Sequence, residues 1–245
     1  LVKKLGHSRH VIKNISKKDV DNSLLTIPNM SESPFDDTSM VPSNIVFSSV
    51  QDLGYSVALT GDGADELFCG YASFGNLSKL ELFLDNKFDF LKRGSNKIFR
   101  NFISNYKSID LERFFMKEDE LLADLSCNGF KKREWKGVID TDYDPLHHLT
   151  DILKETEGLR PLDKFRILNL RFKLPYQMLY KVDRTSMFNS VEARPLFLNN
   201  NIVDASLSIT SSAMLTNGPK SILRKIYQSQ IPHSGWKLPK AGFGW

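Results

Sequence analysis

The sequence predicts an α/β protein in which a sheet-containing portion, residues 1–75, precedes a mainly helical portion, residues 76–245. The first observation is the apolar run at residues 57–59, which is typical of a parallel strand buried on both faces. The second is a helical pattern just before this strand. The third is the recurrence of Leu, Phe and Ile three and four residues apart after residue 71, with little that resembles a strand. Strands alternating with helices imply an α/β layer.

The N-terminal elements follow from local signals. Residues 9–15 alternate loosely and predict a strand. Ser16, followed three residues later by Asp19, predicts the cap of a first helix. Residues 39–52 predict a second helix, which leads into a central strand at residues 55–60.

The second portion is predicted from helical spacing alone. Residues 74–90 and 98–106 are expected to form helices that pack by one apolar face. A further stripe, at residues 165–172, is expected to end where Pro175 breaks the pattern, and another covers residues 222–226. Stripes of this kind are far more often core than cofactor contacts.

Composition limits the classes of protein. The chain has 245 residues, enough for one large or two small domains, with 41% hydrophobic and 25% charged residues. No apolar run approaches the roughly 18 residues of a membrane helix, so we expect no membrane segment. The excess of 33 Lys and Arg over 29 Asp and Glu is too mild to call for nucleic acid. Cys69 and Cys127 lie far apart and lack partners at metal-ligand spacing, so the sequence suggests neither a disulfide framework nor a zinc site, and we expect a reducing cytoplasm.

The stretch most suggestive of chemistry follows the predicted central strand. Gly61 and Gly63 permit a tight turn, and Asp62, Asp65 and Glu66 lie where the strand passes into a helix. Backbone N–H groups and a bound Mg²⁺ would organise such acids around a phosphate group. A surface turn with a capping Asp explains the same spacing, and spacing alone does not decide between them.

Four blocks, in the same order, resemble the asparagine synthetase family. The family pattern Ser-Gly-(Asp/Glu)-Gly-x-Asp-Glu-Leu-Phe-Gly-Gly-Tyr is similar to Thr60-Gly-Asp-Gly-Ala-Asp-Glu-Leu-Phe-Cys-Gly-Tyr71. Upstream lies the block Glu32-Ser-Pro-Phe-Asp-Asp-Thr-Ser-Met-Val-Pro42. Downstream lie Lys181-Val-Asp-Arg-Thr-Ser-Met-Phe-Asn-Ser-Val-Glu-Ala-Arg-Pro-Leu-Phe-Leu198 and Pro239-Lys-Ala-Gly-Phe-Gly244. The resemblance covers nearly the whole chain.

The resemblance implies a fold and a reaction. The fold would be part of a PP-loop ATP pyrophosphatase domain, a parallel sheet followed by helices. In this family ATP and Mg²⁺ activate the side-chain carboxylate of aspartate as an adenylate, and pyrophosphate leaves. Ammonia released from glutamine then attacks to give asparagine. The partners would be aspartate and the ammonia supplied by an N-terminal glutaminase domain; neither nucleic acid nor membrane is implied, and a homodimer is left open.

The resemblance also implies roles for the residues of the first block. Asp65 matches the metal-binding aspartate, and Asp62 matches the acid that handles protons while the amide forms. Thr60 and Gly61 match the pair that meets ATP, where a small residue lets the backbone approach the nucleotide. The alternative is that both acids only cap the following helix.

Two lysines and one ion pair complete the implied site. Lys220 and Lys240 resemble the lysines that hold pyrophosphate and stabilise the charged intermediate. Glu192 and Arg194 would form a buried pair beside the substrate, with Arg194 available to a carboxylate. The alternatives are that Lys220 only begins a helix and that the Glu192–Arg194 pair is purely structural.

The chain departs from the family pattern at several places. Cys69 stands for a common Gly, Thr60 for Ser, and Ser33 for Glu. Pro195-Leu196 inverts the usual Val-Pro order, which moves the φ restriction by one residue.

The pattern at both ends is that of the interior of a longer chain. The sequence contains neither a Ser-Gly-Gly-x-Asp-Ser loop nor the N-terminal Cys of a glutaminase domain, and both would precede Leu1. We therefore expect the isolated segment to be inactive. Two alternatives stay open: a family relative that amidates another acid or a sugar, and a non-catalytic fragment that lacks the PP-loop.

Overall fold

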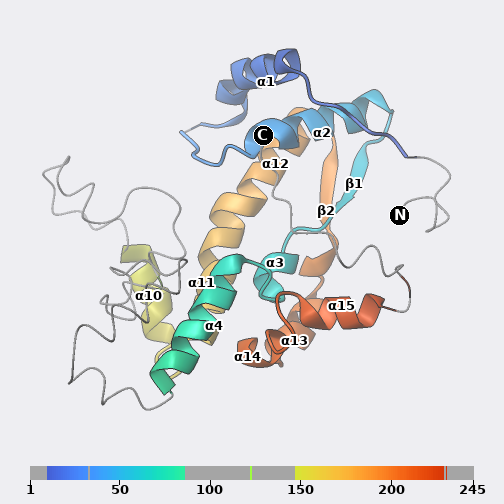
Figure 1. Ribbon diagram of the computed structural model, residues 1–245. Helices are drawn as coiled ribbons and strands as arrows, with labels where there is room; N and C mark the ends of the chain where they lie inside the picture. The colour runs from blue at the N-terminus through green and yellow to red at the C-terminus, as the bar shows by residue number, and fades with distance from the viewer. Residues whose placement is uncertain (1–9, 33, 86–121, 123–146, 229, 231–245) are drawn as a thin grey trace, which may run out of the picture. The chain divides into compact units, whose positions relative to one another are not determined.

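The computed structural model describes residues 10–32, 34–85, 122, 147–228 and 230. Within these residues it is an α/β protein with a two-stranded parallel sheet and mostly helices (Figure 1). The chain divides into two compact units, each made of separated stretches. The first comprises Leu1–Ala64, Leu174–Ala205 and Ile222–Trp245, and the second comprises Asp65–Lys173 and Ser206–Ser221. The predicted helix at 98–106, Cys127 and Lys240 lie outside the described residues.

Helix α1 (Lys17–Met30) begins at the predicted cap. The backbone N–H of Asp19 donates to Ser16 Oγ over 3.2 Å, and Asp19 Oδ2 accepts from the backbone N–H of Ser16 over 2.8 Å. The hydrogen bonds from Ser16, side chain first and backbone second, lower the pKa of Asp19 to about 2. The sequence thus predicted the Ser16 cap correctly, and the structure adds the reciprocal bond of a capping box. The predicted strand before it was wrong: residues 10–15 are exposed and form no strand, since no neighbouring strand pairs with them.

The sheet joins two distant parts of the chain. Strand β1 (Val57–Thr60) follows α2 (Met40–Asp52), and it pairs in parallel with β2 (Glu192–Pro195), which follows α12 (Tyr180–Phe188). The register places Val57 opposite Glu192 and Thr60 opposite Pro195. Helix α2 packs against both α12 and α1. The central strand was expected, whereas β2 was missed because Glu-Ala-Arg-Pro has neither apolar alternation nor a β-branched residue.

One face of the sheet carries the core of the first unit. Phe47, Val182 and Val191 form a buried cluster, against which Ala58 and Ala193 pack. The other face is open among the described residues, because Val57 is 39% exposed and Leu59 is 68% exposed. The prediction of a strand buried on both faces is therefore wrong for this part of the chain. Side chains alternate across a strand, so one covering layer of helices buries only every second residue.

A buried ion pair ties α12 to the segment before α2. Lys181 Nζ donates to Asp37 Oδ2 over 2.9 Å and to Ser39 Oγ over 2.6 Å. Burial alone would raise the pKa of Asp37, but hydrogen bonds from Ser39 and Lys181, together with the lysine charge, outweigh it and lower this pKa overall. The pair joins two of the blocks that resemble the family, residues 32–42 and residues 181–198.

The second unit is helical in its described part. It contains the elements α4 (Ala72–Asp85), α10 (His147–Glu155), α11 (Pro161–Leu168) and α14 (Ser211–Met214). Helix α11 packs against the other three. Phe74 and Phe165 meet edge to face with ring centroids 4.8 Å apart, and neither is exposed to solvent. Glu81 caps α11 by accepting the backbone N–H of Leu162 over 2.6 Å.

The helical path does not end at Pro175, contrary to expectation. A π-helix, η2 (Asn169–Leu179), runs through this proline and continues into α12. Proline removes one N–H donor, and the wider π geometry accommodates that loss without a break. The chain after β2 forms the short elements η3 (Leu196–Leu198), α13 (Asn200–Leu207) and α15 (Ser221–Tyr227). None of the helices in the described ranges combines the length and apolarity that a bilayer span demands.

Candidate functional site

The turn after β1 presents polar atoms that the protein itself leaves unused. Thr60 Oγ1 is buried, and no hydrogen-bond partner is found for it in the described part of the chain. Gly61 is exposed, and a Cβ placed there would meet nothing within 4 Å. Asp62 follows, half-buried. A buried hydroxyl without a partner beside bare backbone fits a ligand that supplies polar atoms, as a nucleotide does.

Gly63 closes this turn and must be glycine. Its φ is +86°, and a Cβ there would lie 2.3 Å from Leu198 Cδ2. The residue is thus in the left-handed region, and it packs against the segment that follows β2. The expected tight turn is present, and its glycine serves both conformation and packing.

The second unit brings Asp65 and Lys220 together. Lys220 Nζ lies 2.9 Å from Asp65 Oδ1, and the two side chains are 31% and 26% exposed. The residues come from the first sequence block and from the segment just before α15, so only the folded chain joins them. Lys220 does directly precede a helix, as the alternative held, but its side chain is engaged with the predicted metal ligand.

Gly70 makes room for this ion pair. A Cβ at position 70 would lie 1.9 Å from Asp65 Oδ1 and 2.4 Å from Lys220 Cε. The backbone N–H of Gly70 also donates to the carbonyl of Asp65 over 2.8 Å. Gly70 belongs to the block at residues 60–71, but the sequence alone assigned it no role. Gly70 lies five residues after Asp65, and the turn after α3 (Ala64–Leu67) brings it back beside Asp65. That spacing was the sequence signal for its role.

Cys69, which stands where the family pattern has Gly, adopts a backbone conformation that favours glycine. Its φ is +52°, in the left-handed region that favours the glycine usually found there. The thiol is free and completely buried, and burial raises its pKa to about 11. Cys69 is therefore an unreactive part of the packing.

Glu66 turns into the protein. Its side chain is buried, it accepts a hydrogen bond from the Tyr71 hydroxyl, and burial raises the pKa of its carboxyl. Lys173 Nζ lies over the Tyr71 ring, 4.6 Å from its centroid. Of the acids after β1, Glu66 thus belongs to the packing, while Asp62 and Asp65 are only half-buried.

Glu192 and Arg194 form the predicted ion pair, but not in a buried place. Arg194 Nε lies 2.7 Å from Glu192 Oε1, Nη2 lies 3.1 Å from Oε2, and the side chains are 59% and 55% exposed. The expectation of a buried pair is therefore wrong. Residues two apart on a strand share a face, and here they lie opposite Val57 and Leu59, on the open face. The contact of Arg194 with a substrate carboxylate stays a prediction.

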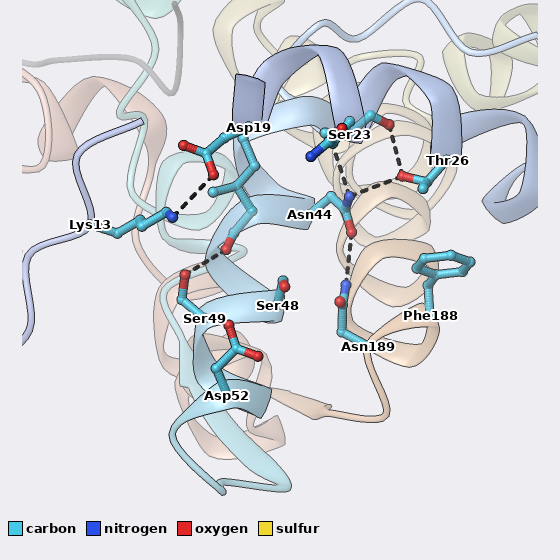
Figure 2. Close-up of a pocket in the computed structure, with 12 residues that line it drawn as sticks. Lys13, Asp19, Ser23, Thr26, Asn44, Ser48, Ser49, Asp52, Phe188 and Asn189 are labelled. Carbon is cyan, nitrogen blue, oxygen red and sulfur yellow. Dashed lines mark hydrogen bonds and ion pairs between the residues drawn. The ribbon is translucent and has the colours of Figure 1, made fainter. Parts of the chain in front are cut away.

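A separate polar pocket of about 300 Å³ lies among α1, α2 and α12 (Figure 2). Asn44 forms its centre, donating to Ser23 Oγ over 3.0 Å and accepting from Asn189 Nδ2 over 2.8 Å. Lys13 and Asp19 pair at its rim over 3.1 Å. None of the predicted site residues lines this pocket.

The side chains around Asp65 are compatible with Mg²⁺ bound partly by water and phosphate, but not with a site in which the protein supplies every ligand. Across the residues that can be described, no group of three or more His, Cys, Asp or Glu side chains is arranged to hold a metal. Mg²⁺ is commonly bound by one or two carboxylates, with waters and substrate phosphates completing its shell. One accessible carboxylate next to a lysine suits that mode of binding.

Comparison with known proteins decides the family. The family described as asparagine synthase matches residues 1–245, the whole chain. The chain belongs to the asparagine synthase family. Putative glutamine-hydrolysing asparagine synthetases of Mycobacterium tuberculosis and Mycobacterium bovis are each 25% identical over 96% of this chain and 36% of the relative. Asparagine synthetase [glutamine-hydrolyzing] 1 of Bacillus subtilis is 26% identical over 96% of this chain and 37% of its own length.

This asparagine synthase domain thus spans about a third of the length of the curated relatives, from the coverage of 36% and 37%. No solved structure gives a significant match.

Proposed function

We propose that this chain is part of the synthetase region of a glutamine-hydrolysing asparagine synthetase with the PP-loop type of fold. The observation that carries the proposal is the Asp65–Lys220 contact of 2.9 Å. It joins a carboxylate suited to Mg²⁺, from the block at residues 60–71, with a cation suited to phosphate oxygens, from the segment just before α15. The names of the relatives support the same activity.

In this proposal each residue has a distinct task. Asp65 holds Mg²⁺, which would neutralise charge on the phosphates as aspartate is activated and pyrophosphate leaves. Lys220 and Lys240 bind the phosphate oxygens. The unpartnered hydroxyl of Thr60 and the bare backbone of Gly61 bind ATP.

Asp62 manages protons in the second half of the reaction. Its carboxylate takes a proton from ammonia as the nitrogen attacks activated aspartate, and releases it to solvent afterwards. Its half-buried place on the turn after β1 leaves it accessible to a substrate. Arg194, exposed on the open sheet face and paired with Glu192, would bind the aspartate carboxylate.

The deciding experiment incubates the complete natural protein with ATP, glutamine and aspartate. We expect asparagine, AMP and pyrophosphate in equal amounts, and no asparagine when ATP is omitted. Formation of a different amide from another acid or a sugar would reassign the acceptor within the family. Glutamine hydrolysis without any ATP-dependent product would overturn the proposal.

The two acids are separated by their variants in the complete protein. Asp65→Asn removes a charge from the metal ligand and should lower ATP-dependent turnover by orders of magnitude, with glutamine hydrolysis largely intact. Asp62→Asn should retain pyrophosphate release but slow amide formation by roughly 10²–10⁴-fold, because an amide cannot take up the proton. Single-turnover assays of pyrophosphate and asparagine measure both. The reverse pattern would exchange the two assignments, and no effect in either variant would leave both acids as helix caps.

A further inference from the structure

Lys220 contacts the very carboxylate that is proposed to hold the metal. Its ammonium approaches Asp65 Oδ1, which is also the oxygen nearest the position of a Cβ on Gly70. Ammonium and divalent cations both bind the lone pairs of a carboxylate oxygen, and two positive charges at one oxygen repel each other. Lys220 in this position therefore competes with a cation for Asp65.

The backbone around Lys220 is shaped to deliver the side chain to this place. Lys220 has a φ of +54°, a conformation that residues with a Cβ rarely adopt, and Gly218 before it has a φ of +86°. Residues held in such conformations cluster where function demands a particular placement. Gly70, on the other side, leaves the space that the lysine methylenes and the carboxylate occupy.

Both partners are accessible enough to exchange ligands. The side chains of Asp65 and Lys220 are 26% and 31% exposed, so that water, a metal ion or a phosphate can reach them. A fully buried pair would have to break against a large desolvation cost, whereas water can replace either partner of a partly exposed pair, so this pair opens at a smaller cost. The ion pair is thus suited to opening.

We propose that Lys220 is a tethered counter-ion that occupies Asp65 in the nucleotide-free protein and is displaced when a divalent cation binds. The proposal rests on the function proposed above and adds a means of regulating that site. Lys220, once displaced, is free to pair with a phosphate oxygen of the nucleotide that accompanies the cation. The contact of Lys220 with Asp65 would thus weaken binding of a divalent cation alone and favour binding of the cation together with nucleotide.

The test measures Mn²⁺ binding to the complete, nucleotide-free protein by electron paramagnetic resonance. Lys220→Met keeps most of the side-chain volume and removes the charge, and it should tighten Mn²⁺ binding at this site by on the order of five-fold, the free energy of a half-exposed ion pair expressed as affinity. Lys225→Met removes a charge from an exposed position of α15 and should leave Mn²⁺ affinity unchanged. Lys220→Arg, which keeps the charge, should stay within two-fold of the natural protein.

Asp65→Asn distinguishes failure of this inference from failure of the proposed function. It should abolish the Mn²⁺ site in the natural and the Lys220→Met backgrounds alike. If the site disappears while Lys220→Met leaves Mn²⁺ affinity unchanged or weakened, the counter-ion role is wrong and the metal role of Asp65 stands. If Mn²⁺ binding survives Asp65→Asn, the metal is held elsewhere and both ideas fall. Thermal unfolding of each variant confirms that a lost site is not a lost fold.

Discussion

Two Lys–Asp pairs in this chain have the same length and different surroundings. Lys181 and Asp37 in the first unit, and Lys220 and Asp65 in the second, each meet at 2.9 Å. The side chains of the first pair are 10% and 14% exposed, and Ser39 adds a hydrogen bond to the lysine. Those of the second pair are 31% and 26% exposed. Distance alone therefore does not reveal the role of an ion pair.

The difference in burial separates a structural pair from a site for ligands. Removing one partner of a buried pair leaves an uncompensated charge away from water, so the protein keeps such a pair closed. A partly exposed pair exchanges its partners for water or a ligand at a smaller cost than a buried one. The pair of the first unit thus fixes α12 to the segment before α2, and the pair of the second unit is the one to which we assign cation exchange.

The largest expected effect is on the buried pair. Lys181→Met should lower the free energy of unfolding by about 3 kcal/mol, because it leaves the carboxylate of Asp37 buried without its counter-charge. Lys220→Met should lower it by less than about 1 kcal/mol. Urea denaturation of the complete protein, followed by circular dichroism, measures both. Equal losses in the two variants would remove the distinction between the pairs.

Gly70, which contacts the second pair, and Gly75, which lies in α4 (Ala72–Asp85), should show smaller effects of opposite sign. Gly70→Ala should cost about 1–2 kcal/mol and separate Asp65 from Lys220, because the new methyl group overlaps both side chains. Gly75→Ala, within α4 and with nothing near its Cβ position, should instead stabilise the protein by roughly 0.5–1 kcal/mol. Thermal melting and the asparagine assay distinguish them. A stable Gly70→Ala variant with full activity would show that the close approach of Asp65 and Lys220 is dispensable.

The smallest effect is the pH dependence of the buried pair. The pKa of Asp37 is lowered in the folded state, so its stabilisation is complete above the ordinary value of 3.8 and is lost as pH falls through the folded-state pKa. Lys181→Met removes the lysine hydrogen bond and charge that help to lower this pKa, so the pKa of Asp37 should rise in the variant and protonation should relieve the destabilisation as the pH falls. The stability deficit of Lys181→Met should therefore shrink between pH 7 and pH 4.

An exposed pair provides the control for this pH effect. Lys154 and Asp151 meet at 3.5 Å with side chains 72% and 73% exposed. The deficit of Lys154→Met, measured by urea denaturation at the same pH values, should be close to zero throughout. A deficit of Lys181→Met that grows on acidification would contradict the assigned shift of Asp37.

Local signals in the sequence determined the elements whose cause is local. The capping box of Ser16 and Asp19 and the helix over residues 39–52 depend on neighbours within a turn or two, so they were predicted closely. The central strand was also placed correctly, by its apolar run and the glycines after it. The family was recognisable from four blocks of residues, and the match over the whole chain confirms it.

Tertiary structure decided what depends on distant partners. Strand β2 has no strand pattern of its own and forms because β1 offers it hydrogen bonds, while the helix passes Pro175 because the π geometry absorbs the missing donor. Glu192 and Arg194 are exposed because no layer in the described part of the chain covers their face of the sheet. The contacts of Lys181 with Asp37 and of Lys220 with Asp65 join residues far apart in the chain. No local sequence pattern encodes these ion pairs, because the burial of each side chain and the distance between the charged groups depend on the packing of the whole unit.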